Sequence, residues 1–148
     1  MEQGELEDLY QEIILDHSRN PRNNESLESP DVAGEAVNPF CGDETEIQLV
    51  LNDGHVTTVG GKAKGCAISQ AARSLLSDRL SGKTVVEIEA LIALFQSLLQ
   101  GQQMSESEMD TLGDLTVLAG VRQFPVRIKC ALLPSMALED GIVTFKRK

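Results

Sequence analysis

The chain has 148 residues, of which 41% are apolar and 24% charged, and its formal net charge is −10. This length predicts a single domain over residues 1–148 with a core that needs no disulfides, and the acidic charge argues against nucleic-acid binding. No apolar run approaches the roughly 20 residues of a membrane-spanning helix. The acidic start also lacks the layout of a secretory signal, so we expect a cytoplasmic protein with reduced cysteines and no membrane contact.

The first predicted elements are a helix, a loop and a strand. Apolar residues recur at helical spacing near the N-terminus, and Asn20-Pro21 ends that pattern. The stripe consists of Leu6, Leu9, Tyr10, Ile13 and Ile14. The polar stretch 22–30 predicts a loop, and residues 32–37 fit a strand.

A β-hairpin is predicted between Glu44 and Lys64. Apolar residues alternate with polar ones on both sides of the turn Asn52-Asp53-Gly54. These residues are Ile47, Leu49 and Leu51 before the turn, and Val56 and Val59 after it. Together with residues 32–37, the hairpin would form a three-stranded sheet.

Helical spacing resumes after Cys66 and predicts a helix that continues to Gly82. Thr84 can cap the next helix, which ends before Gly101. The stretch 102–110 is polar and interrupts the helical pattern, whereas residues 112–120 fit a short helix or turn.

The last helix is predicted to start at Phe124-Pro125, because proline is tolerated in the first helical turn. Cys130 would then lie about one and a half turns into it. Pro134 lacks a backbone donor and should kink or interrupt this helix near Leu133. We therefore expect an irregular C-terminal segment.

Three cysteines and one aspartate are the candidate metal ligands: Cys41, Asp43, Cys66 and Cys130. Their spacing is C-x-D, then 22 residues, then 63 residues between the last two cysteines, unlike the local cysteine pairs of a zinc finger. Turns at Cys41 and Cys66 could present both thiols at the same end of the sheet. Spacing alone leaves open that the cysteines are buried fillers and that Asp43 is a turn residue.

Charges around the cysteines give further expectations. Cys66 at a helix start would have its thiolate stabilised by unpaired amides and the helix dipole. Arg122, Arg127 and Lys129 would favour a thiolate at Cys130.

The two histidines are not assigned to the metal. For His17 we expect a capping or surface role, although its side chain could bind a metal in principle. His55 is expected to be solvated in the hairpin turn.

Several motifs in order resemble the SufU branch of the IscU/SufU/NifU-N family over nearly the whole chain. They are Leu9-Tyr10 through His17, Asn20-Pro21-Arg22-Asn23, Asn38-Pro39-x-Cys41-Gly42-Asp43, Gly65-Cys66-Ala67-Ile68-Ser69 and Phe124-Pro125-x-Arg127-Ile128-Lys129-Cys130. Lys129 stands where IscU-type scaffolds have histidine, and residues 100–114 resemble a SufU insertion. The resemblance implies an α+β fold of the SufE/NifU-like type, with a small antiparallel sheet and helices packed on one side.

The resemblance also implies a zinc site made by Cys41, Asp43, Cys66 and Cys130. It points to Cys41 as the acceptor of sulfur from a PLP-dependent, SufS-like cysteine desulfurase, a sulfurtransferase-like role. Asp43 would be the exchangeable ligand. Arg127 would bind the partner, or serve as a counter-charge to the metal site, and a downstream Suf scaffold is a further potential partner.

Three functional hypotheses follow from this resemblance. The leading one is a zinc-dependent sulfur acceptor for iron–sulfur cluster assembly. The alternative is a scaffold that holds a transient [2Fe–2S] cluster on the same ligands. The third is a zinc-stabilised structural domain without sulfur chemistry. Departures from the family pattern before Cys66 (Gly61, Ala63) and after Cys130 (Pro134-Ser135-Met136) could alter the strand and the partner interface.

Overall fold

Strand residues build an antiparallel sheet whose inner face is apolar. The computed structural model describes residues 3–40 and 42–148, with side chains of the first helix described from Tyr10 onward. The predicted hairpin is confirmed, and Ile47 and Leu49 alternate into the core. Its turn is formed by Asp53 and Gly54, both with positive φ. The predicted strand at 32–37 is confirmed as well and pairs antiparallel with the hairpin's first strand.

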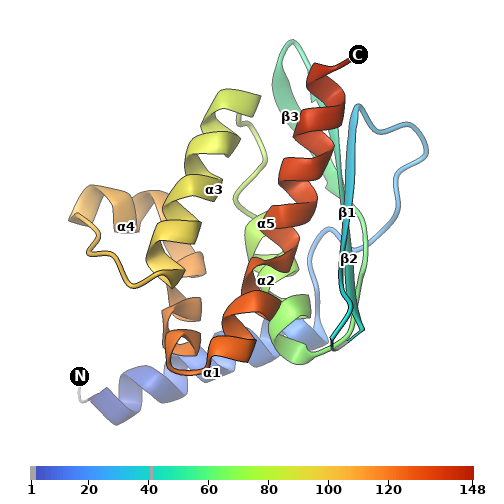
Figure 1. Ribbon diagram of the computed structural model, residues 1–148. Helices are drawn as coiled ribbons and strands as arrows, with labels where there is room; N and C mark the ends of the chain where they lie inside the picture. Colours follow the sequence, from blue (N-terminus) through green and yellow to red (C-terminus); the bar gives the residue numbers. More distant parts are fainter. Residues whose placement is uncertain (1–2, 41) are drawn as a thin grey trace.

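The element order is helix, four strands and then helices (Figure 1). The elements are α1 (Gln3–Arg19), β1 (Val32–Asn38), β2 (Asp43–Asn52), β3 (His55–Gly60), β4 (Ala63–Lys64), α2 (Ala67–Ser77), α3 (Val85–Leu99), α4 (Glu106–Leu112), the 3₁₀ helix η1 (Gly113–Gln123) and α5 (Pro125–Lys146). The strand order is β1-β2-β3, and β4 also pairs with β2. The two-residue β4 adds to the three strands expected from the sequence.

The helices lie on one side of the sheet, and α5 (red) runs along it (Figure 1). Buried side chains from the sheet, α2, α3, η1 and α5 form one core. The predicted α+β fold, with helices packed on one side of a small antiparallel sheet, is confirmed. No helix in the described residues is long and apolar enough to cross a membrane.

The expected break at Pro134 is wrong, because α5 is one helix from Pro125 to Lys146. Proline inside a helix costs about 3 kcal/mol, but Leu133, Leu138 and Ile142 are buried here, and each contributes about 1.5–3 kcal/mol on burial. The backbones of α5 and β1 also meet closely, since a Cβ on Gly34 would overlap the carbonyl oxygen of Ala137. Packing against the sheet therefore outweighs the cost of the proline.

Two other helix boundaries differ from the sequence expectation. Helix α2 ends at Ser77 rather than near Gly82, because the chain after it hydrogen-bonds to Val56 at the start of β3: Gly82 N donates to Val56 O, and Val56 N donates to Lys83 O. The polar stretch 102–110 contains the start of α4.

Two predicted helix starts are confirmed. Thr84 caps α3 in a reciprocal capping box with Glu87. Pro125 occupies the first turn of α5. This start fixes the rotation of α5 and, with it, the position of Cys130 in the second turn.

Candidate metal centre

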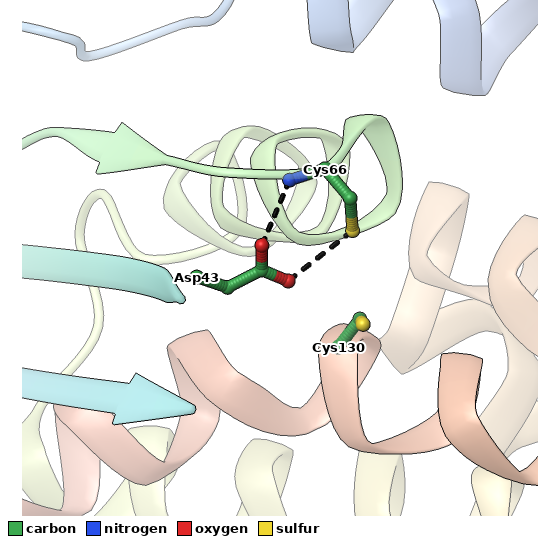
Figure 2. Close-up of side chains that lie close together, drawn as sticks. All are labelled: Asp43, Cys66 and Cys130. Carbon is green, nitrogen blue, oxygen red and sulfur yellow. Dashed lines mark hydrogen bonds between the residues drawn. The ribbon is translucent and has the colours of Figure 1, made fainter. Parts of the chain in front are cut away.

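Three elements bring Asp43, Cys66 and Cys130 together. Asp43 is the first residue of β2, Cys66 immediately precedes α2, and Cys130 is on α5. One ligand atom from each lies within 4.8 Å of the other two. Figure 2 shows these side chains converging on one space, with the carboxylate of Asp43 facing Cys66. Residues separated by up to 63 positions thus form one cluster.

The carboxylate of Asp43 is held by Cys66 through both of its oxygens. The Cys66 amide donates to Oδ1 at 2.9 Å, and the Cys66 thiol donates to Oδ2 at 3.3 Å (Figure 2). Asp43 is 2% exposed, so these hydrogen bonds satisfy a carboxylate that has little contact with water. The side chain is therefore oriented before any metal binds.

Cys66 is the N-cap residue of α2, as its predicted position at a helix start requires. Its Sγ accepts a hydrogen bond from the backbone N–H of Ser69 at 3.5 Å, which is one of the unpaired donors at a helix N-terminus. The hydroxyl of Ser69 donates to Cys66 O at 3.1 Å. Ser69 received no role from the sequence, although the pattern C-x-x-S at a helix start is a signal for this contact.

Cys130 is 3% exposed, and its environment differs from the positive surroundings expected from the sequence. Burial, followed by hydrogen bonds with Cys66 and Asp43, raises the pKa of Cys130 to about 12. The cations Arg122, Arg127 and Lys129 are exposed, so the expectation that they favour a thiolate is wrong for the metal-free site. A bound cation would have to supply that stabilisation.

The donor set suits zinc. Two sulfurs and one carboxylate oxygen are ligands that Zn²⁺ takes in tetrahedral sites. Zinc bond lengths of about 2.0–2.3 Å place neighbouring ligands roughly 3.3–3.8 Å apart, and the 3.3 Å between Cys66 Sγ and Asp43 Oδ2 fits that range. Cys41, the predicted fourth ligand and sulfur acceptor, lies outside the described residues, where the chain passes from β1 to β2.

The histidines are not part of this cluster in the described residues. The expected surface role of His17 is wrong: the residue is 5% exposed, and its Nδ1 lies 2.7 Å from Ser74 Oγ. Burial lowers the pKa of His17, so the ring favours its neutral form. His55 is exposed at the hairpin turn, as expected.

The surface beside the cluster carries cations and exposed aromatic rings. Lys129 Nζ lies 5.7 Å from the centre of the Phe40 ring, within cation–π range, and Phe40 is 90% exposed. Arg127 is exposed and lines a groove of about 700 Å³ between α1 and the starts of α2 and α5. Ile14, Ile68 and Phe124 give this groove an apolar wall.

Residues 9–148 match the model of the NifU-like N-terminal domain. The chain belongs to this family. The motif resemblance is therefore confirmed at family level, and the match includes every candidate site residue.

Individual members of the NifU-like family share most of this chain. It is 36% identical over 137 residues to the zinc-dependent sulfurtransferase SufU of Bacillus subtilis, covering 93% of this chain and 91% of that protein. It is 33% identical over 139 residues to the iron–sulfur cluster assembly scaffold protein IscU of Streptococcus pyogenes, covering 94% and 86%.

A solved structure supports the fold. The putative scaffold protein for the SUF system from Fervidobacterium islandicum superimposes with a TM-score of 0.82 at 27% identity, covering 88% of this chain and 94% of that one. The chain is thus a member of an iron–sulfur cluster assembly family. The names of its relatives divide between sulfurtransferase and scaffold, so the family alone does not assign the chemistry.

Proposed function

We propose that this protein accepts persulfide sulfur from a PLP-dependent, SufS-like cysteine desulfurase and carries it for iron–sulfur cluster assembly. The observation that carries this proposal is the convergence of Asp43, Cys66 and Cys130 within 4.8 Å. With Cys41 as the fourth ligand, three thiolates and a carboxylate would complete a tetrahedral zinc site. Its formal charge of −2 would lie near Lys129 and Arg127.

The sulfur step needs one reactive thiolate. Cys41, as thiolate, attacks the terminal sulfur of the desulfurase persulfide; a new S–S bond forms on Cys41, the old one breaks, and the desulfurase cysteine leaves as its thiolate. No external oxidant or reductant is needed. Work in the cytoplasm agrees with this chemistry, because a disulfide would remove the required thiols.

Zinc, when bound, would keep its cysteine ligands ionised at neutral pH without redox chemistry of its own. The protein's residues supply the geometry. The Ser69 N–H holds the sulfur of Cys66, and the Cys66 amide holds the carboxylate of Asp43. Asp43 is the proposed exchangeable ligand, since oxygen is the odd donor in a sulfur-rich shell.

Arg127 is proposed as the partner-binding residue. It stands at the first turn of α5 between the cluster and the apolar groove. An exposed guanidinium beside apolar walls fits a partner surface that combines a carboxylate with apolar side chains. After leaving this partner, the carrier would hand its sulfur to a downstream Suf scaffold.

A scaffold that holds a [2Fe–2S] cluster remains the second candidate, because the Streptococcus pyogenes relative is named as a scaffold and the same ligands could bind iron. Lys129 favours the carrier. It occupies the position next to Cys130 where the IscU pattern has histidine, and a lysine ammonium has no lone pair for a metal.

Sulfur transfer with and without zinc tests the proposal. The protein is loaded with one equivalent of zinc or stripped with a chelator, then mixed with a cysteine desulfurase and ³⁵S-cysteine. Zinc-loaded protein should accept about one sulfur per chain, and the apo form should accept at least roughly tenfold less, because its thiols are largely protonated. Equal uptake by both forms would remove zinc from the function, and no uptake by either would favour the structural-domain hypothesis.

A further inference from the structure

Gly65 lies directly before Cys66, and its lack of a side chain has a specific consequence for Asp43. The residue has φ +134°, a conformation that L side chains rarely adopt. A Cβ added there would overlap Oδ1 of Asp43, lie 2.6 Å from its carboxyl carbon and lie 2.9 Å from its Cα. The obstacle includes the backbone of β2, so it cannot be relieved by moving a flexible side-chain end.

The space left by Gly65 is filled by the Asp43 carboxylate. Because this carboxylate approaches the chain so closely, its Oδ1 reaches the amide of Cys66 at 2.9 Å. That hydrogen bond assigns the two oxygens different tasks. Oδ1 is occupied by the backbone, whereas Oδ2 faces the Cys66 sulfur at 3.3 Å.

We propose that Gly65 is a positioning residue that makes Asp43 a single-oxygen ligand. By admitting the carboxylate against the Cys66 amide, it holds Oδ1 away from the metal and presents Oδ2 alone. The inference rests on the proposed metal site. Its structural part, the dependence of the amide bond on Gly65, concerns the metal-free protein and stands apart from sulfur transfer.

This arrangement also bears on exchange of Asp43 at the metal. A carboxylate that keeps its backbone hydrogen bond while Oδ2 leaves the metal stays in place to return. Partners that orient a metal ligand in this way typically contribute 10–100-fold to metal affinity. Gly65→Ala should therefore weaken zinc binding by about 10–100-fold, although residue 65 offers no ligand atom.

The first measurement uses apo protein and ¹H–¹⁵N NMR spectra. Gly65→Ala should move the Cys66 amide proton upfield, because the charge-assisted hydrogen bond to Asp43 is lost. Asp43→Ala should move the same resonance in the same direction. Gly82→Ala is the matched control: Gly82 also has positive φ, +81°, but a Cβ there meets no atom within 4 Å. This control should leave the Cys66 resonance in place.

The second measurement is a double-mutant cycle for zinc affinity. If Gly65 acts through the carboxylate, Gly65→Ala should change zinc affinity less than about twofold in an Asp43→Ala background. Additive losses, or an unchanged Cys66 amide shift in Gly65→Ala, would overturn the proposal.

Should Gly65→Ala fail to fold, the double variant decides the matter. Folding restored by Asp43→Ala supports overlap with the carboxylate, and a double variant that also fails points to backbone strain at residue 65 and overturns the proposal. A positive cycle combined with absent sulfur uptake would reject the proposed function while leaving the role of Gly65 intact.

Discussion

Replacing Cys41 by serine should reduce sulfur uptake from a cysteine desulfurase by at least about 100-fold, since a serine hydroxyl is not ionised at neutral pH and does not attack a persulfide as a thiolate does. The measurement is transfer of ³⁵S from labelled cysteine, with the accepted sulfur located by mass spectrometry of peptides under non-reducing conditions. In the wild type, the added sulfur should be on the peptide that contains Cys41.

Ser18→Ala is the control for this variant, since Ser18 is an exposed residue on α1 whose hydroxyl bonds only locally to Leu15 O. It should accept sulfur at the wild-type rate. Unchanged uptake by Cys41→Ser, or wild-type label found on Cys66 or Cys130, would remove Cys41 from the acceptor role.

Replacing Cys130 by serine should weaken zinc binding by about 100- to 1,000-fold. Structural zinc sites with four ligands contribute about 10–16 kcal/mol, so one ligand accounts for roughly 3–4 kcal/mol, and 1.4 kcal/mol corresponds to a factor of ten. Competition with a chromogenic zinc chelator measures the change. The zinc-dependent rise in unfolding temperature should shrink in parallel.

Lys129→Ala is the matched variant for Cys130→Ser, because Lys129 is the preceding residue on α5 but is exposed and offers no metal ligand. Its zinc affinity should stay within about threefold of the wild type, since one exposed charge contributes little. Comparing each variant with and without chelator separates loss of metal from damage to the fold. If Cys130→Ser bound zinc as tightly as the wild type, Cys130 would not be a ligand.

Local signals predicted most of the fold. The turn Asn52-Asp53-Gly54, the cap at Thr84 and the proline at Pro125 each act within a few residues, and the structure follows all three. The start of α4 was missed although its signal was local. Ser105 and Glu108 form a reciprocal capping box, and the pattern S-x-x-E is readable in the sequence.

Features decided by tertiary contacts could not be read from the sequence. Pro134 carries the same helix-breaking signal in any sequence, but here close packing of α5 on β1 outweighs it. His17 looked like a surface residue, and only the position of α1 beside α2 places its ring against Ser74. The end of α2 depends on hydrogen bonds to Val56 in another element.

The candidate site shows the same division. Spacing placed Cys66 at a helix start, which the structure confirms. Nothing in the spacing showed that Asp43 and Cys130 would meet it, because their approach depends on how β2 and α5 pack. The resemblance to a known family supplied that grouping. The raised pKa of Cys130 opposes the sequence expectation because its cause is burial, which charge patterns do not reveal.

The most direct test of the central claim is zinc K-edge X-ray absorption on protein purified without added metal, together with metal analysis and a visible spectrum. The account predicts a colourless protein with about one zinc per chain, bound by three sulfurs at about 2.3 Å and one oxygen at about 2.0 Å. A zinc shell of nitrogen and oxygen alone, or a brown protein with stoichiometric iron in place of zinc, would contradict it.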